Sequence, residues 1–466
     1  MFAAALIAAA HRRANLREAM TLGGAAATFL SILRFVEPVL AGERPRLVLG
    51  EMMPGLALVL ELEPLGLLFA LIAAGLWLVS GLYSIGYMRG NDEVHQTRFY
   101  VCFALAIASA IGVALAGNLL TLYLFYEALT LITWPLVTHH GDAEAQRGGR
   151  TYLGVLLASS LLCLLPAMAA TWWLSGTLDF RPGGILAGHA SGGAAAGLLA
   201  LYAFGIGKAA LMPIHRWLPA AMVAPTPVSA LLHAVAVVKA GVFSIVKVVV
   251  YVFGFDFGAE AFTWLTWVAG FTIVAASIVA LRSDNLKRRL AYSTVSQLSY
   301  VVLAAALLTP LSLAGAVLHI AAHAFGKITL FFAAGAVYTA AHKTEVSQLD
   351  GVGRRMPWTF AAFGVGALSM IGLPPAAGFV SKWYIVSGAL AAEHWLALAV
   401  ISASTLLNAG YFLPIVYRAF FKEGKDEDHG EAPWTMVAAL VATAALTVAM
   451  FFWAELPLAL ARRVGA

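Results

Sequence analysis

The sequence is poor in charge and in cysteine, and both shortages restrict the class of protein it can encode. Of its 466 residues, 11% are charged and 61% are hydrophobic, whereas soluble domains carry about 25% charged residues. Two cysteines, Cys102 and Cys163, are too few for a metal cluster or a disulfide framework, and we expect them to be small packing residues. No GxGxxG or GxxxxGK(S/T) motif stands in a strand–helix setting. We therefore expect no cofactor, no metal and no redox centre on this chain.

Long apolar segments dominate instead. A stretch of about 20 apolar residues can span a bilayer as a helix, and such stretches recur along nearly the whole chain. Met1–Ala10 is apolar but too short to span, and it lacks the basic start and cleavage site of a signal peptide. Counting it as a shortened first helix raises the number of transmembrane helices from thirteen to fourteen. The pattern predicts an all-α polytopic membrane protein with helices near 19–40, 56–88, 99–117, 118–138, 152–175, 194–218, 227–253, 263–281, 288–308, 312–340, 358–390, 394–420 and 434–460.

The net charge of +5 does not indicate a nucleic-acid partner, because the basic residues follow the predicted bilayer. If Arg12 and Arg13 lie inside the cell and the helices alternate in direction, most basic residues of the connections fall inside. Arg147 and Arg288 are examples, while Arg181 falls outside. Such an inner excess is typical of multi-pass membrane proteins. Together with abundant Ala and Gly, it favours a bacterial inner (plasma) membrane.

Prolines interrupt two of the predicted helices, and a lysine accompanies each interruption: Pro213 and Pro219 follow Lys208, and Pro374 and Pro375 precede Lys382. Proline inside a helix removes a backbone hydrogen bond and frees carbonyl groups. In lipid those groups must be satisfied by protein or water, so a break is typical of an internal cavity, with a simple kink as the alternative.

The two broken helices lie five spans apart, so strict alternation gives them opposite directions. Opposed broken helices are typical of inverted repeats, whose sites lie near the middle of the membrane. We predict two inverted five-helix repeats, 99–253 and 263–420, each with one proline-broken helix. N-terminal peripheral helices in 1–98 and a C-terminal helix at 434–460 flank them.

Ionisable residues fall where this chain should cross the middle of the bilayer. Each charge at the centre of a membrane helix costs about 2.5–3.5 kcal/mol, so a chain that only had to fold would use Leu there. The pattern predicts a polar path for protons or other ions, formed by Glu127, Lys208, His233, Lys239, His319, His323, Lys327 and Lys382.

Glu127 and Lys208 form the first predicted pair. A buried lysine can lose and regain a proton near neutral pH, and a carboxylate beside it opposes that loss. At about 4 Å and an effective dielectric constant of about 20, the pair is worth roughly 4 kcal/mol. Driving one charge against about 150–200 mV takes roughly 3.5–4.6 kcal/mol. Rearranging the pair could therefore move one proton, and a static ion pair between helices is the alternative.

Lys239 is the next predicted relay group, on the same helix as His233 but on a different face. His233 is either part of the relay or a packing residue. Lys247 lies nearer the outer end of the helix, where we expect its long side chain to reach the membrane surface. We therefore leave Lys247 out of the path.

His319, His323 and Lys327 recur at intervals of four residues and so share one stripe of a helix. A zinc site there would lack a third ligand, whereas histidine can accept a proton on one ring nitrogen and donate from the other. We predict that this stripe relays protons between the two repeats. Lys382 would be the terminal donor toward the far side.

Six segments resemble the antiporter-like membrane subunits shared by respiratory complex I and the Mrp-type cation/proton antiporters. They are, in order, LFYEALTL, GIGKAALMPIHRWLP, APTPVSALLHAVAVVKAG, LKRRLAYSTVSQLSY, LHIAAHAFGKITLFFAAG and GLPPAAGFVSK. The resemblance covers roughly residues 99–420 and looks strongest to the D subunit of the Mrp antiporters and the middle complex I pump subunit. It implies that the proton path uses Glu127, Lys208, Lys239, His319, His323 and Lys382. The short apolar start, and the presence of both His233 and Lys239, depart from the family pattern.

Two functions lead, and a third is open. The first is a transport module that moves protons, alone or in exchange for Na⁺ or K⁺, as one subunit of a larger complex in the lipid bilayer. The second is a proton-pumping subunit of a complex I-like (NADH:quinone oxidoreductase) or hydrogenase-type translocase, with the chemistry on other subunits. The third is a structural homologue that no longer conducts. The expected partners are other membrane subunits and small cations.

Overall fold

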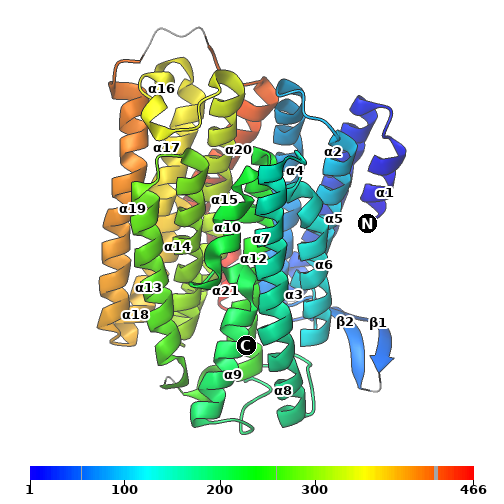
Figure 1. Ribbon diagram of the computed structural model, residues 1–466. Helices are drawn as coiled ribbons and strands as arrows, with labels where there is room; N and C mark the ends of the chain where they lie inside the picture. Colours follow the sequence, from blue (N-terminus) through cyan, green and yellow to red (C-terminus); the bar gives the residue numbers. More distant parts are fainter. Residues whose placement is uncertain (54, 259, 425–428, 466) are drawn as a thin grey trace.

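Helices packed side by side form nearly the whole of the computed structural model (Figure 1). It describes residues 1–53, 55–258, 260–424 and 429–465. Within these residues, 10 helices are long and apolar enough to cross a membrane. Two shorter apolar helices, Gly192–Gly205 and Pro357–Ile371, each end at a break in the chain's helices. The predicted helical, multi-pass membrane fold is confirmed, while its division into two inverted repeats stays a prediction.

Most of the predicted segments in the first half of the chain coincide with one helix or a run of helices. Three π-helical turns interrupt or extend these helices, at Ser160–Leu164, Leu231–Val235 and Val249–Phe253. The helices are α1 (Phe2–Ala9), α2 (Ala14–Leu33), α3 (Val36–Leu40), α4 (Pro64–Gly90), α5 (Gln96–Ala114), α6 (Leu119–Val137), α7 (Ala143–Ser159), α8 (Leu165–Ser175), α9 (Gly192–Gly205), α10 (Trp217–Ala220), α11 (Thr226–Ala230) and α12 (Val237–Val248).

The second half follows its predicted segments closely. The long helix α15, for example, starts where the sequence supplies a cap: the Thr309 hydroxyl accepts a hydrogen bond from the Ser312 N–H at 3.1 Å, and Pro310 occupies the first helical position. The helices are α13 (Glu260–Arg282), α14 (Leu286–Ala306), α15 (Pro310–Ala341), α16 (Val352–Arg355), α17 (Pro357–Ile371), α18 (Ala377–Ala391), α19 (Trp395–Phe421), α20 (Trp434–Phe452) and α21 (Glu455–Ala461).

The helix predicted at 56–88 begins later than expected. A two-stranded antiparallel hairpin, β1 (Arg46–Met53) and β2 (Leu56–Glu61), occupies its first residues and projects from the bundle at the lower right of Figure 1. Helix α4 starts at Pro64 because Glu63 caps it, accepting a hydrogen bond from the Leu65 N–H at 3.2 Å. The apolar residues before the cap therefore pair as strands.

Helices α12 and α15 form the centre of the bundle (Figure 1). The most apolar stretch is 100% buried in Thr226–Phe253 and 94% buried in Pro310–Ala341, against 33% in the peripheral α19. Ionisable residues on these two central helices therefore face protein rather than lipid. Helix α12 also packs directly on the first break, because a Cβ on Gly241 would lie 2.2 Å from the carbonyl carbon of Lys208.

Candidate functional site

The predicted path residues come from the two breaks, the central helices and α6. Seven of the eight are buried, and Glu127 is half-buried with its carboxylate enclosed. Their elements are α6 for Glu127, the turn at 207–209 for Lys208, the π-helical turn for His233, α12 for Lys239, α15 for His319, His323 and Lys327, and α18 for Lys382.

The first break holds Lys208 against α6. Its Nζ donates hydrogen bonds to the carbonyl oxygen of Tyr126 at 2.8 Å and to the hydroxyl of Thr130 at 2.6 Å. The same Nζ lies 3.1 Å from the centre of the Tyr126 ring, and the Lys208 backbone N–H donates to the Tyr126 hydroxyl at 3.0 Å. An aromatic face and two oxygen acceptors can hold a cation without a carboxylate in direct contact.

Glu127 does not form the direct ion pair with Lys208 that the sequence predicted. Among the described residues, neither carboxylate oxygen accepts a hydrogen bond, although the two charges are near enough to interact electrostatically. Tyr126 and Thr130 are four residues apart and share a helix face. Glu127 follows Tyr126 by one residue and so points about 100° away from it. The lysine therefore binds the face of α6 beside the carboxylate.

Lys239 and His323 are in direct contact between α12 and α15. The Lys239 Nζ and the His323 Nδ1 form a hydrogen bond, and both side chains are buried. A hydrogen bond between two nitrogen atoms needs one of them to be an unprotonated acceptor. The geometry therefore favours one shared proton over two charged groups, as a relay requires. The ring of His319 follows, with its centroid 6.1 Å from that of His323.

His319 connects this pair to the second break. Its Nε2 lies 3.1 Å from Oε1 of Gln297, and its Nδ1 lies 2.9 Å from the Ser381 hydroxyl on α18. The amide of Gln297 donates in turn to the carbonyl oxygen of Met370 at 3.3 Å. Both ring nitrogens of His319 thus have polar partners, which suits a group that takes up and gives up protons.

The second break supplies the oxygen atoms that bind Lys382. Its Nζ donates to the carbonyls of Met370 at 2.9 Å and Ile371 at 3.0 Å. These carbonyls lack helical partners because α17 ends at Ile371. Gly372 follows with a φ of +93°, and a Cβ there would lie 2.6 Å from Cδ of the lysine. The glycine therefore makes both the turn and the space for Lys382.

Lys327 connects to the Met370 carbonyl through three other side chains. Its Nζ donates to the Ser293 hydroxyl at 2.7 Å, and that hydroxyl lies 3.1 Å from the Tyr411 hydroxyl, to which it can donate. Tyr411 donates its one proton to Oδ1 of Asn408, whose amide donates to the Met370 carbonyl at 3.4 Å. The structure thus brings His319, Lys327 and Lys382 into one hydrogen-bonded network.

Sequence reasoning missed the neutral members of this network. Gln297 and Asn408 are buried amides inside largely apolar helices, and that is the signal that could have identified them. Buried amides need partners, as buried charges do. Ser293 carries no comparable signal, because serine hydroxyls in helices often bond to their own backbone, and Tyr411 carries none because tyrosine also packs as an apolar ring.

His233 stands apart from the network. It is fully buried, its ring packs on Phe331 with centroids 4.9 Å apart, and neither ring nitrogen has a side-chain hydrogen-bond partner among the described residues. Among the described residues, no hydrogen bond joins Lys208 to Lys239 or to His233. The structure therefore divides the predicted path into three parts: Lys208 with Glu127, His233, and the set from Lys239 to Lys382.

Lys247 does not reach the membrane surface, contrary to the expectation from the sequence. It is buried, its Nζ lies 3.2 Å from Oε1 of Glu63, and it donates to the Ala116 carbonyl at 2.7 Å. The Tyr251 hydroxyl donates to the other oxygen of Glu63 at 2.7 Å. Because its helix is enclosed on all sides, the side chain finds a carboxylate inside the protein instead of water.

Comparisons with known sequences agree with the six segments. Residues 116–408 match a family model whose description is "NADH:quinone oxidoreductase/Mrp antiporter, TM". The chain is 34% identical over 396 residues to NADH-quinone oxidoreductase subunit N of Desulforudis audaxviator, covering 83% of this chain and 77% of that protein. It is 31% identical over 401 residues to a Na(+)/H(+) antiporter subunit of Bacillus subtilis. That match covers 80% of this chain but 49% of the relative, so the chain spans about half its length.

Two solved structures share the fold over the whole chain. A chain of the Mrp complex from Dietzia sp. DQ12-45-1b has a TM-score of 0.89 at 21% identity. A chain of the membrane-bound sulfane sulfur reductase, an archaeal respiratory membrane complex, has a TM-score of 0.85 at 22% identity. Each match covers 100% of this chain and 95% of the other.

Proposed function

We propose, because the chain belongs to the NADH:quinone oxidoreductase/Mrp antiporter transmembrane family, that it moves protons across a bacterial inner membrane as one subunit of a larger membrane complex. The run of neighbouring titratable groups from Lys239 through His323 and His319 to Lys382 carries this proposal. Ionisable residues are costly at this depth and are retained there for ion pathways and proton relays.

Each path residue has a role in this proposal. Glu127 and Lys208 release and rebind a proton at the first break, since the charge of one biases the proton affinity of the other. His233, Lys239, His323 and His319 pass the proton through the centre. Lys327 and Lys382 release it at the second break. Exchange for Na⁺ or K⁺ is part of the proposal, in line with the names of the antiporter relatives.

Transport in membrane vesicles tests the path. We expect Lys208→Ala to abolish proton movement while the complex still assembles, because the replacement removes the cation and leaves the helices in place. Lys422→Ala is the matched control, since Lys422 is an exposed lysine on a connection and its loss should leave transport unchanged. Normal transport by Lys208→Ala would reject the assigned path and favour a chain that no longer conducts.

A redox-driven complex is the second candidate. Its support is the identity to NADH-quinone oxidoreductase subunit N, together with hydrogenase-4 component B of Escherichia coli, which is 30% identical over 422 residues. Purification of the intact complex and identification of its subunits separates the two candidates. Small antiporter subunits support cation/proton exchange, whereas iron–sulfur, hydrogenase-like or quinone-site subunits support redox-driven pumping.

A further inference from the structure

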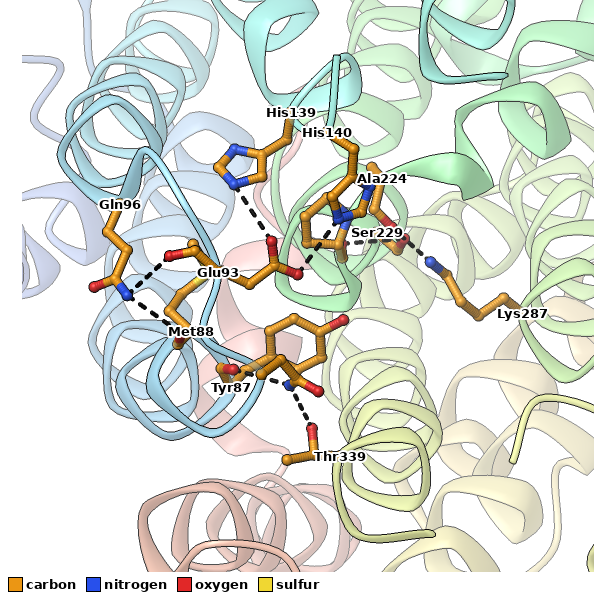
Figure 2. A network of polar contacts seen from close by, with 12 residues as sticks. Tyr87, Met88, Glu93, Gln96, His139, His140, Ala224, Ser229, Lys287 and Thr339 are labelled. Atoms are coloured by element: carbon orange, nitrogen blue, oxygen red, sulfur yellow. Dashed lines mark hydrogen bonds and ion pairs between the residues drawn. The ribbon is translucent and has the colours of Figure 1, made fainter. Parts of the chain in front are cut away.

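A cavity of about 390 Å³ opens at the end of the bundle that the charge pattern places inside the cell. It lies between the connections after α4 and α6, the starts of α11 and α14, and the end of α15. Figure 2 shows three of its charged or titratable lining residues, Glu93, His140 and Lys287. Glu144 and Lys343 also line the cavity. None of these residues belongs to the path described above.

Glu93 lies between two histidines that differ in their access to water (Figure 2). One carboxylate oxygen lies 3.4 Å from Nε2 of His140, whose side chain is 39% exposed. The other lies 3.6 Å from Nε2 of His139, whose side chain is 0% exposed, while Glu93 itself is 10% exposed. The three groups therefore run from the cavity mouth to the protein interior.

The surrounding charges give the two histidines opposite tendencies. The hydrogen bond from Glu93 raises the pKa of His140, Asp142 adds to this effect, and Lys287 and burial oppose it. Burial lowers the pKa of His139 to about 4, although the Glu93 charge partly offsets it, and Arg98 and His140 lower it further. The carboxylate thus favours the protonated form of the exposed histidine, while the buried one is neutral near neutral pH.

The floor of the cavity leads toward His233. Thr226, which lines the cavity, is followed at intervals of three and four residues by Ser229 and His233, a spacing that keeps them on one helix face. On α15, Ala334 also lines the cavity, and Phe331, about one turn deeper, packs on the His233 ring. His233, which has no side-chain hydrogen-bond partner among the described residues, is thus about two turns below the cavity floor.

We propose that Glu93, His139 and His140 form a proton-loading site at the inner mouth of the path. His140 takes a proton from water in the cavity at Nε2, Glu93 accepts it on its carboxylate, and the proton moves through the cavity toward His233 while Glu93 returns to its ionised form. This inference rests on the proposed function, and it gives His233 a place in the path as the first buried acceptor.

Inverted membrane vesicles test this site, because the membrane face that lay inside the cell is turned toward the medium. The initial transport rate is measured as the pH of the medium varies at fixed lumenal pH, for wild type, Glu93→Gln and His140→Gln. We expect both variants to shift the pH of half-maximal rate downward by about one unit, a tenfold change in proton concentration, with the rate at acidic pH retained. His11→Gln, which replaces an exposed histidine in the N-terminal segment, is the matched control.

Profiles of Glu93→Gln and His140→Gln that superimpose on the wild-type profile would overturn the inference, provided that Lys208→Ala abolishes transport in the same vesicles. If Lys208→Ala transports normally, the proposed function fails instead. Should Glu93→Gln fail to assemble, His140→Gln decides the matter alone, because His140 is half exposed and its side chain bonds to Glu93.

Discussion

The two helix breaks hold their lysines in different ways. Lys208 lies in the first break itself and binds another helix, through the Tyr126 carbonyl and the Thr130 hydroxyl of α6. Lys382 lies one turn beyond the second break and reaches back to the end of the helix before it, at Met370 and Ile371. One combination of proline and lysine thus produces two sites, because the lysine precedes the prolines in one and follows them in the other.

This difference indicates at which break a movement of helices can change the partners of the lysine. The partners of Lys208 sit on α6, and Glu127 points about 100° around the same helix, so a rotation of α6 would exchange the hydroxyl and carbonyl for a carboxylate. The partners of Lys382 are backbone carbonyls, which neither titrate nor move independently of the break. We infer that the first site responds to changes in packing, while the second responds to the network of His319 and Lys327.

Removing the second lysine should have the largest effect on transport. We expect Lys382→Met to reduce proton movement to background without lowering the thermal unfolding temperature, because replacing a buried charge by an apolar group of similar volume is often neutral or stabilising. Transport in vesicles and thermal unfolding of the purified complex provide the two measurements. Strong destabilisation with partial transport would assign Lys382 a structural role.

Gly372→Ala should disturb the second break and leave the first intact. We expect a loss of about 1–3 kcal/mol in the free energy of unfolding from the left-handed backbone, together with a large loss of transport because the new methyl group meets Lys382. Gly176→Ala is the matched control: its φ is +70° but nothing lies within 4 Å of its Cβ. If both variants transport equally well, the contact between Gly372 and the lysine has no functional role.

Thr130→Val should weaken the first site alone. It removes one hydrogen bond to a charged group, worth roughly 1.5–3 kcal/mol, and keeps the volume of the side chain. We expect a partial loss of transport, on the order of tenfold, that Thr130→Ser restores because serine keeps the hydroxyl. Equal rates for the valine and serine variants would show that the Tyr126 carbonyl and ring are sufficient to hold Lys208.

Replacing His139, which lies in the connection after α6, should have the smallest effect of these changes. This residue lies outside both breaks. Because the pKa of His139 is about 4 in the folded protein, below its ordinary value of about 6.5, the unfolded chain binds more protons between these values. Stability therefore rises with pH across this window. We expect His139→Gln to flatten this dependence in thermal unfolding from about pH 4 to 6.5. An unchanged slope would contradict the lowered pKa.

The helices could be predicted well because bilayer thickness fixes the length of an apolar run. The hairpin at 46–61 could not, since its apolar residues read like the start of a helix until the cap at Glu63 is recognised. The burial of Lys208, Lys239, His319, His323, Lys327 and Lys382 could likewise be predicted, because a charged residue stands out among Leu and Ala in an apolar segment. Their partners were not, since most are backbone carbonyls, hydroxyls and amides contributed by distant helices.

The sequence by itself determined that this chain is a multi-pass helical membrane protein with titratable groups inside its apolar segments and two broken helices. These properties follow from local composition, because hydropathy and proline act on the residues around them. Only the tertiary structure decided that Lys208 binds beside Glu127 instead of to it, that Lys247 is buried against Glu63, and that a hydrogen-bonded network around Met370 connects three of the predicted path residues. Such contacts depend on which faces of distant helices meet, and that is set by packing across the whole bundle.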